Sequence, residues 1–383
     1  MEEREALYLL KELISFDTVS PQGRQYEDLV KFLKEWLEER GVSTKVEYVD
    51  EEYRSKFCPE GPKPLLFAWV GEGEPVLEFN GHYDVVPPGE GWEGDPFEAR
   101  VEGHYVVGRG ASDMKSGVAA IALALANLTN LRGKKVQAVF VPDEEVGGRC
   151  GTGYRVYKLK DKYKIGKHVV IAESSGKAVW VGHKGAVWIE VKVKGEQAHA
   201  SMPWLGDNAF IKASHLALYL KERLTSSWQR RPSSYEYTSS HPLAKFNTLT
   251  LGGVAYSTSN KPNVIPGTFV FTMDIRVIPE ESAEMVAKEV YDLLPDFVEA
   301  NVLELMEPFL NKDSYVGELI ERKWGHPRRV CEAGLDLRYY RGYDAVAWGP
   351  GDYAEAHKPN EKVSLLDVLE FAEKYSELAL VIE

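Results

Sequence analysis

The spacing of apolar and polar residues predicts both helices and strands in the first 180 residues. Two runs with helical spacing fill the first forty positions, on either side of the break SPQG at 20–23. The Ala-rich stretch DMKSGVAAIALALANL (113–128) predicts a further helix, buried from its first turn. Shorter apolar runs, typical of strands, lie at 42–49, 64–71, 75–82, 134–143 and 167–174. Strands that alternate with helices indicate an α/β sheet between helix layers, that is, a three-layer α/β/α domain.

The pattern changes near residue 181. AVWIEVKVKG (186–195) alternates apolar and polar residues, which predicts a half-buried strand with one wet face. The polar, Ser-rich stretch 225–242 is expected to be a loop. The remaining elements expected here are helices at 208–224 and 281–294 and strands at 246–254, 268–278 and 298–305. This segment therefore predicts a separate α+β unit, with two helices on one antiparallel sheet.

The earlier pattern returns after this unit. A helix at 314–324, a strand at 345–351 and a C-terminal helix at 363–381 predict that the chain rejoins the first sheet. We therefore expect a larger domain made of residues 1–180 and 307–383, with a smaller domain of residues 181–306 inserted into it.

Charge and composition exclude several partners. A net charge of −13 over 383 residues argues against nucleic acid and anionic membranes, because both bind basic surfaces. No apolar run approaches the roughly 18 residues of a transmembrane helix, and the acidic N-terminus MEEREALYLLKELISF is not expected to be a signal peptide. The cysteines, Cys58, Cys150 and Cys331, form no CxxC pair, which is typical of a reducing, cytoplasmic setting.

Ionisable residues collect after several of the predicted strands. In FNGHYDVVPPG (79–89), His82 ends a strand, and Asp84 is placed to orient its ring. A loop histidine beside a solvated aspartate is the alternative. In GRGASDMKSG (108–117), Asp113 precedes a helix and is either its N-cap or a metal ligand.

Two adjacent glutamates in PDEEVGG (142–148) follow another strand. Like charges at the end of a buried strand cost free energy unless a partner compensates them. In an extended segment Glu144 and Glu145 point in opposite directions, so one could bind a metal while the other faces a bound water. Glu173 ends the next strand, and His357 follows a further one in GPGDYAEAHKPNE (349–361). A His/Asp/Glu set without cysteine suits zinc, cobalt or manganese, and Asp113 can bridge two ions.

These motifs, together with HKGAVWIEVKVKGEQAHASMPWLGDNA (183–209), resemble a family of co-catalytic metallohydrolases. The family includes acetylornithine deacetylase, succinyl-diaminopimelate desuccinylase, aminoacylase and glutamate carboxypeptidase, and the motifs appear in its order over residues 79–361. The resemblance implies that the larger domain is catalytic and that the inserted domain is a lid and dimerisation domain. It also implies a homodimer and two divalent metal ions, expected to be Zn²⁺, with Co²⁺ or Mn²⁺ as alternatives.

The resemblance also implies a role for each site residue. One metal would be bound by His82, Asp113 and Glu173, and the other by Asp113, Glu145 and His357. Glu144 matches the general base, and Asp84 the residue that orients His82. The remaining positions implied are His199 as the oxyanion donor from a partner subunit, and Asn263, Arg276, Asp336, Arg338 and Gly351 as substrate contacts.

Structural alternatives exist for the inserted-domain residues. Arg276, expected to bind a substrate carboxylate, could instead pair with Asp274 or Glu280. His199 could be an ordinary loop histidine, and Asp336 with Arg338 could be a surface ion pair. The desuccinylases of the family typically carry Thr and Ser just before that Asp, whereas this chain has Gly334 and Leu335.

The function expected is metal-dependent hydrolysis of the amide bond of an N-acylated amino acid with a free carboxylate. A carboxypeptidase or dipeptidase would share every catalytic residue, so the motifs leave that alternative open. A non-catalytic binding protein on the same fold is a third hypothesis, but binding alone does not require a base such as Glu144.

Overall fold

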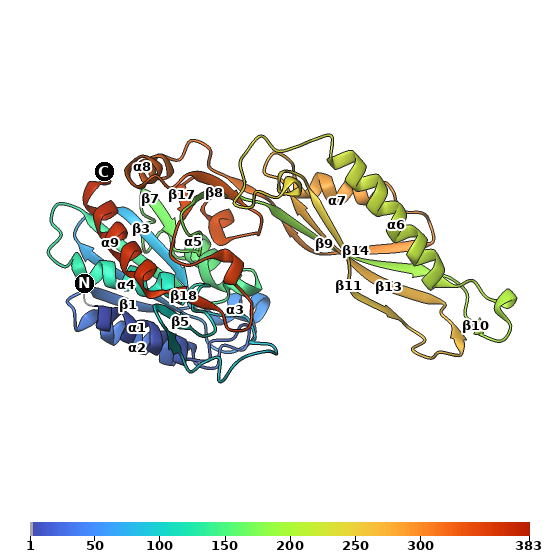
Figure 1. The fold of residues 1–383 in the computed structure, drawn as a ribbon, viewed down its shortest axis with the longest axis horizontal. Helices are drawn as coiled ribbons and strands as arrows, with labels where there is room; N and C mark the ends of the chain where they lie inside the picture. Colours follow the sequence, from blue (N-terminus) through green and yellow to red (C-terminus); the bar gives the residue numbers. More distant parts are fainter. Residues whose placement is uncertain (1–2) are drawn as a thin grey trace. The chain divides into compact units, whose positions relative to one another are not determined.

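The computed structural model describes residues 3–383, which divide into two compact units (Figure 1). The first unit holds residues up to 181 together with 311–328 and 339–383, and the second holds 182–310 and 329–338. The first segment of the second unit thus ends at residue 310, four residues after the expected 306. Residues 329–338 also belong to it, although the sequence pattern assigned them to the larger domain.

The first unit supplies most strands of a large sheet, in which four neighbouring strands are parallel. Within the described residues its strand order is β1-β2-β6-β3-β7-β17-β8, with β15 (Phe309–Leu310) and β16 (Arg328–Cys331) beside β8. The strands are β1 (Ser43–Tyr48), β2 (Pro64–Gly71), β6 (Lys135–Val141), β3 (Pro75–His82), β7 (His168–Ile171), β17 (Asp344–Ala347) and β8 (Val179–His183). β6, β3, β7 and β17 run parallel to their neighbours in this group. Their carboxyl ends therefore lie along one edge.

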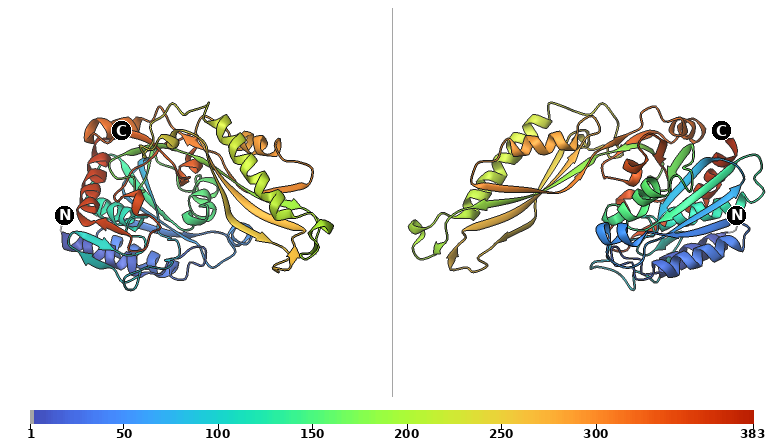
Figure 2. Two further views of the ribbon diagram at one scale, coloured as in Figure 1. Left: turned by 45° about the vertical axis from the view of Figure 1, so that its right-hand side comes forward. Right: turned by 180° about the vertical axis from the view of Figure 1, so that it is seen from behind.

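Helices cover this sheet on both faces, as Figures 1 and 2 show. On one face, Phe79 of β3 contacts Tyr375 of α9, and Gly81 lies against Val118 of α4. On the opposite face Asn80 donates a hydrogen bond to Thr152, which lies just before α5. The helices are α1 (Glu3–Ser15), α2 (Tyr26–Glu38), α3 (Glu51–Phe57), α4 (Lys115–Asn127), α5 (Tyr154–Lys158), α8 (Tyr315–Trp324) and α9 (Leu365–Val381). The predicted α/β/α arrangement is confirmed.

α4 is apolar around most of its circumference, because it is buried on all sides. Residues 115–125 are all buried, and the helix contacts both α1 and α9 as well as β3. A small separate sheet lies outside this layer, with the order β18 (Lys362–Ser364), β5 (Tyr105–Val107) and β4 (Arg100–Glu102). α3, β8 and this small sheet were not predicted, since short segments carry too few residues to show a period.

The second unit is the predicted antiparallel sheet with two helices on one face. Its strand order is β11 (Thr248–Ser257), β13 (Thr268–Val277), β9 (Gly185–Lys194) and β14 (Val298–Met306). The odd-numbered residues 187–193 of β9 pack against α6 (Ala209–Trp228) and α7 (Ala283–Tyr291). Even-numbered β9 residues such as Trp188 and Lys192 face the other side and are less buried, which is the alternation that the sequence showed. A short pair, β10 (Ala198–His199) with β12 (Val264–Ile265), completes the unit.

The cysteine pattern was misinterpreted. Cys58 and Cys150 form a disulfide across 92 residues of sequence, and only Cys331 is free among the described residues. The pairing was missed because two distant cysteines give no sign of their proximity. The disulfide removes the cysteine-based argument for a reducing compartment. Among residues 3–383, no helix combines the length and the apolar character needed to cross a membrane.

Candidate metal centre and active site

The predicted metal ligands gather where the parallel strands of the first unit end. His82 is the last residue of β3, Glu173 follows β7, and Glu145 and His357 lie in the segments after β6 and β17. His82 is in register with Val141 of β6, so the ends of these two strands coincide. In open α/β sheets, sites form at the carboxyl ends of the strands, because the connecting loops converge there.

Asp113 lies between the two histidines. Its Oδ1 atom is 3.2 Å from His82 Nε2, and its Oδ2 atom is 3.4 Å from His357 Nε2. Each histidine has a second carboxylate nearby: Glu173 Oε1 is 3.8 Å from His82 Nε2, and Glu145 Oε2 is 3.1 Å from His357 Nε2. The five side chains thus form two sets that share Asp113.

Burial strengthens the electrostatic interactions among the side chains of this cluster. Burial and the nearby Asp113 charge raise the pKa of Glu145 to about 7. Burial alone would raise the pKa of Asp113, but its hydrogen bonds with His357 and His82 outweigh burial and lower that pKa. Hydrogen bonds to Asp113 and Glu145 raise the pKa of His357 to about 10. Without a metal, the histidines are therefore the groups that supply compensating positive charge.

The donor set fits divalent metal ions. Ligand atoms of His82, Asp113 and Glu145 all lie within 4.8 Å of one another. Among the described residues, Glu145 Oε1 is buried and has no hydrogen-bond partner, which is costly for a carboxylate oxygen unless a cation binds it. Imidazole nitrogens and carboxylate oxygens are the ligands that zinc, cobalt and manganese accept.

The PDEEVGG segment forms a tight turn, so the expectation of an extended segment was wrong. Asp143 adopts a left-handed conformation with φ 62°, and residues 144–146 form one turn of 3₁₀ helix. Gly147 and Gly148 also have positive φ angles, of 100° and 62°, which glycine adopts without strain. Glu144 is partly exposed, and the ligand side chain of Glu145 beside it is 7% exposed.

Asp84 contacts this turn more closely than the sequence suggested. Its carboxylate accepts hydrogen bonds from the backbone N–H groups of Glu144, at 3.0 Å, and Glu145, at 3.2 Å. His82 Nδ1 lies 3.0 Å from the backbone oxygen of Asp84 and 3.5 Å from its carboxylate. Asp84 therefore joins the His82 strand end to the glutamate turn.

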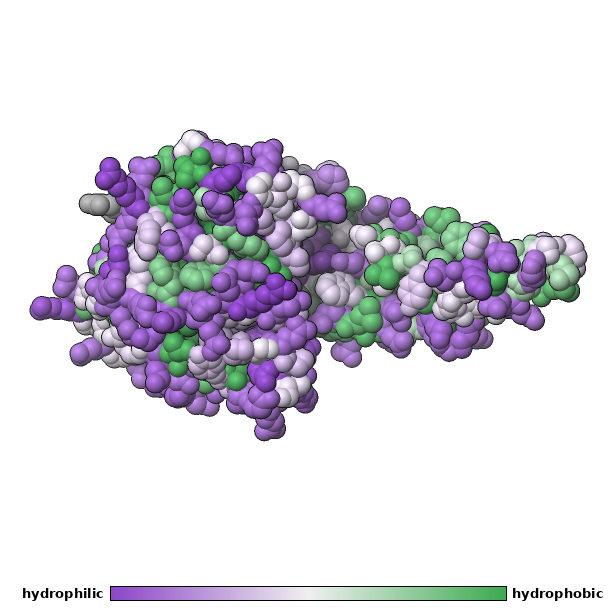
Figure 3. All heavy atoms as spheres, turned by 90° about the horizontal axis from the view of Figure 1, so that it is seen from below, coloured by the Kyte–Doolittle hydropathy of each residue, from purple (hydrophilic) through white to green (hydrophobic). Residues whose placement is uncertain are grey.

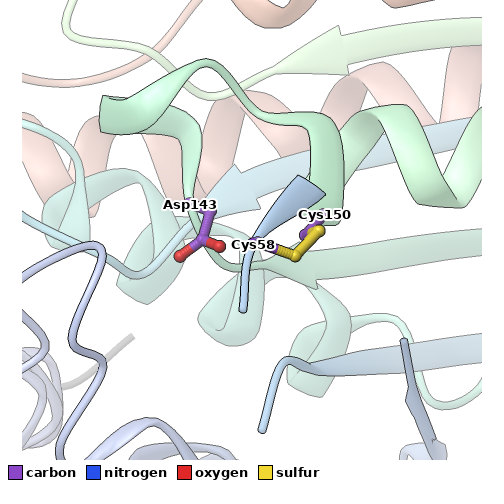
Figure 4. A group of neighbouring side chains, drawn as sticks. All are labelled: Cys58, Asp143 and Cys150. Carbon is purple, nitrogen blue, oxygen red and sulfur yellow. A yellow bond between two sulfur atoms is a disulfide. The ribbon is translucent and has the colours of Figure 1, made fainter. Parts of the chain in front are cut away.

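A buried ion pair and the disulfide hold the two ends of the turn. Lys63 Nζ is 2.9 Å from Asp143 Oδ1, and Tyr26 donates a hydrogen bond to the same oxygen. Figure 4 shows the disulfide of Cys58 and Cys150 next to the Asp143 carboxylate. These three residues lie close enough to suggest a second metal group. Sulfurs joined in a disulfide are not thiolates, however, so the group is structural here.

The second unit brings two predicted residues together. His199 pairs with Val264 between β10 and β12, and the backbone oxygen of Asn263 accepts the Ala200 N–H at 3.1 Å. The Ser201 backbone N–H donates to His199 Nδ1 at 3.1 Å, so Nδ1 is an acceptor and the ring proton lies on Nε2. The exposed His199 ring can therefore donate a hydrogen bond through Nε2.

Arg276 already has a partner within its own unit. Its Nε and Nη2 atoms donate to the Asp274 carboxylate at 2.8 and 3.0 Å. Both residues lie on β13 two positions apart, so they share one face of the strand. The Asp274 pairing considered as an alternative is the one present, and it uses two of the five guanidinium N–H groups.

The other predicted substrate contacts are mostly buried. Arg338 Nη2 is 3.6 Å from Asp336 Oδ1, but Asp336 is only 1% exposed, so the pair does not lie on the surface. In the first unit, Gly351 has φ 98°, and a Cβ atom there would lie 2.6 Å from Ser112 Oγ. Gly351 therefore allows close packing against the segment that carries Asp113.

Sequence reasoning missed two charged residues that lie close to the ligands. Arg109 and Glu361 are each about 1% exposed and pair at 2.6 Å between Nη1 and Oε2. Both belong to the motifs quoted above, in GRGASDMKSG and GPGDYAEAHKPNE. The signal that could have identified them is the arginine among glycines and small residues, because an arginine that is buried there needs a charged partner.

An α/β fold whose parallel strands end in this histidine and carboxylate cluster defines a metal-dependent hydrolase. Residues 79–381 match the model of Peptidase family M20/M25/M40, and the chain belongs to this family. A similar protein, the succinyl-diaminopimelate desuccinylase of Gluconobacter oxydans, is 34% identical over 335 residues, covering 82% of this chain and 84% of that protein. The predicted family is confirmed.

Solved structures share the fold. The M20 family metallo-carboxypeptidase Sso-CP2 from Sulfolobus solfataricus superposes with a TM-score of 0.74 at 20% identity, covering 99% of each chain. The YXEP protein of Bacillus subtilis, a dinuclear metal binding peptidase from the M20 family, superposes with a TM-score of 0.64 at 15% identity. It covers 99% of this chain and 98% of its own. At these identities the likeness establishes the fold.

We predict that His357→Ala lowers the metal content from about two equivalents to about one, because it removes one of the side chains that meet at Asp113. Its ring is 52% exposed, so truncation leaves little buried cavity and the fold should persist. Elemental analysis of dialysed protein measures the outcome. His241→Ala, an exposed histidine of the second unit, is the control and should keep wild-type content. Equal metal content in both variants would contradict the ligand assignment.

Proposed function

We propose that this protein hydrolyses the amide bond of an N-acylated amino acid that carries a free carboxylate. The observation that carries the proposal is the position of Asp113, whose two oxygens face different histidines, next to the turn that holds Glu144 and Glu145. Such an arrangement suits a pair of ions with an adjacent base. The proposed substrate class, N-acylated amino acids, agrees with the desuccinylase name of the Gluconobacter oxydans relative.

In this proposal His82, Asp113 and Glu173 bind one ion, and Asp113, Glu145 and His357 bind the other. The ions, which we propose are Zn²⁺ with Co²⁺ or Mn²⁺ as alternatives, would supply a water of lowered pKa and polarise the substrate carbonyl. Asp84 keeps the ligand segments aligned, since it contacts both the His82 strand end and the glutamate turn.

Glu144 is the proposed general base and acid. It removes a proton from the attacking water as the new C–O bond forms, and it then delivers that proton to the leaving nitrogen as the C–N bond breaks. Its backbone N–H donates a hydrogen bond to Asp84, and the residue is partly exposed. A fixed backbone with an accessible carboxylate suits a group that must face the substrate.

The second unit would supply the remaining contacts. His199 Nε2 is proposed to donate a hydrogen bond to the oxyanion, and the three N–H groups of Arg276 that Asp274 does not use would bind the substrate carboxylate. Asn263, adjacent to His199, is proposed as a further contact, as are Asp336 and Arg338 of the same unit and Gly351 of the first unit.

We also propose that the second unit forms a homodimer and that His199 acts in the partner subunit's site. Apolar side chains are exposed around the start of α6 and the preceding segment, and Figure 3 shows apolar residues among the polar ones on the viewed face. The most exposed are Trp204, Leu205, Phe210, Ile211 and Leu218. Exposed apolar groups gathered in this way favour an interface.

The second candidate is a carboxypeptidase or dipeptidase. It is favoured by the fold shared with the metallo-carboxypeptidase Sso-CP2 and by Gly334 and Leu335, which depart from the residues typical of desuccinylases. We predict that the zinc-loaded protein hydrolyses N-acetyl or N-succinyl amino acids faster than dipeptides, with ninhydrin detection of the released amine. A higher kcat/KM for dipeptides would favour the peptidase. Inertness towards all of these substrates would favour a binding protein.

We predict that Glu144→Gln lowers kcat by about 10²- to 10⁴-fold while the metal content stays at the wild-type value, because the amide has no proton affinity at neutral pH. Glu145→Gln is the matched control one residue away, and it should lose metal instead. Steady-state kinetics and elemental analysis of the same preparations distinguish the two roles. Near-normal turnover by Glu144→Gln would contradict the assignment of the base.

A mixing experiment tests the role of His199. We predict that His199→Ala and Glu144→Gln homodimers are each nearly inactive, since loss of an oxyanion donor costs about 10²- to 10³-fold. Refolding the two variants together should restore about a quarter of wild-type activity, because each heterodimer then contains one complete site. The absence of recovery in mixtures whose heterodimers are verified by native mass spectrometry would contradict action across subunits.

A further inference from the structure

A buried carboxylate, Glu361, accepts hydrogen bonds from the backbone of the segment that carries Asp113. Its Oε1 atom accepts the N–H groups of Ser112, at 2.7 Å, and Asp113, at 2.8 Å. Its Oε2 atom accepts the N–H of Gly110 at 3.2 Å and the Arg109 guanidinium at 2.6 Å. The carboxylate is 1% exposed, so among the described residues these donors take the place of the water that would otherwise solvate it.

Arg109 extends this arrangement to two other ligand segments. Its Nη2 atom donates to the backbone oxygen of Pro88 at 3.0 Å, in the segment after His82. Longer contacts reach the backbone oxygens of His357, at 3.5 Å, and Lys358, at 3.3 Å. Glu361 itself lies four residues after His357. One ion pair therefore contacts the backbones near His82, Asp113 and His357.

We propose that Arg109 and Glu361 are positioning residues that hold Asp113 and His357 at the spacing required for two metal ions. This inference rests on the proposed metal centre and concerns residues that touch neither metal nor substrate. A carboxylate shared by two ions must present both oxygens in a fixed plane, and consecutive N–H groups bound to one acceptor restrict the backbone of Asp113. The charge of Glu361 strengthens those bonds over those of a neutral acceptor.

The alternative is that the pair only stabilises the fold, as buried ion pairs elsewhere do. The same unit offers a matched case in Glu78 and Arg155, which pair at 2.7 Å with both side chains fully buried. Glu78 Oε2 also accepts a backbone N–H, from Gly166 at 3.2 Å, and its other partners include Gln137 and Tyr340. None of these contacts reaches a proposed metal ligand, so substitution of Glu78 measures the purely structural effect of losing a buried ion pair.

The test compares Glu361→Gln with Glu78→Gln. Both variants remove the negative charge that pairs with a buried arginine, so both should lower the melting temperature of the metal-free protein. Zinc affinity is measured on metal-free protein by competition with a fluorescent zinc chelator, and circular dichroism verifies the fold. We expect Glu361→Gln to weaken zinc binding by about 10- to 100-fold and Glu78→Gln to leave it unchanged.

Arg109→Lys provides a second variant in case Glu361→Gln does not fold. Lysine keeps the positive charge beside Glu361 but lacks the planar fork that contacts several carbonyls at once, so zinc affinity should again fall while the fold is retained. Equal zinc affinity in wild type, Glu361→Gln and Arg109→Lys would overturn the positioning role while leaving the metal centre intact. If both Glu→Gln variants weakened zinc binding alike, the effect would be general destabilisation, which also overturns it. If wild-type protein itself bound no zinc, the proposed function would fail first.

Discussion

Electrostatic repulsion among buried carboxylates is the constraint on which the site depends. Asp113, Glu145 and Glu173 meet at the carboxyl ends of neighbouring parallel strands, and each is almost fully buried. Two unit charges about 4 Å apart repel by about 4 kcal/mol at an effective dielectric constant of 20. Histidine protons supply part of the compensation, as the raised pKa of His357 indicates. Bound divalent ions would supply the remaining positive charge, and they would do so without protonation of the imidazole nitrogens that coordinate them. The cluster therefore suits metal ions better than an ordinary ion-pair network.

The buried acidic groups fall into two classes according to their partners. Asp84 and Glu361 accept hydrogen bonds from backbone N–H groups, and Asp143 Oδ1 accepts them from Lys63 and Tyr26, so these carboxylates have partners within the fold. Asp113 and Glu145 instead face the two histidines. The compensated groups also position the ligand segments, since each contacts the backbone or lies in the turn beside a ligand. Acidic residues near a site are therefore better classified by their donors than by their distance from one another.

Much of the site could be predicted because strand periodicity is local and the edge rule for parallel sheets is general. An apolar run that ends in His82 or Glu173 places that side chain at the edge without knowledge of the rest of the fold. The errors arose from contacts between distant segments. The turn at Glu144 depends on Asp84, 60 residues earlier, and Cys58 pairs with a residue 92 positions away. Periodicity carries no information about such contacts, so the expectation of an extended segment was wrong and the disulfide was not predicted.

Under the proposed function, substrate recognition and chemistry depend on residues of different units. The proposed base and metal ligands all belong to the first unit, whereas His199 and Arg276 belong to the second. In this chain Asp274 occupies the Nε and Nη2 side of the Arg276 fork, so only Nη1 and one N–H of Nη2 remain for a ligand. A substrate carboxylate that binds Arg276, as proposed, would therefore use the Nη1 end of the guanidinium, because Asp274 already holds the opposite side.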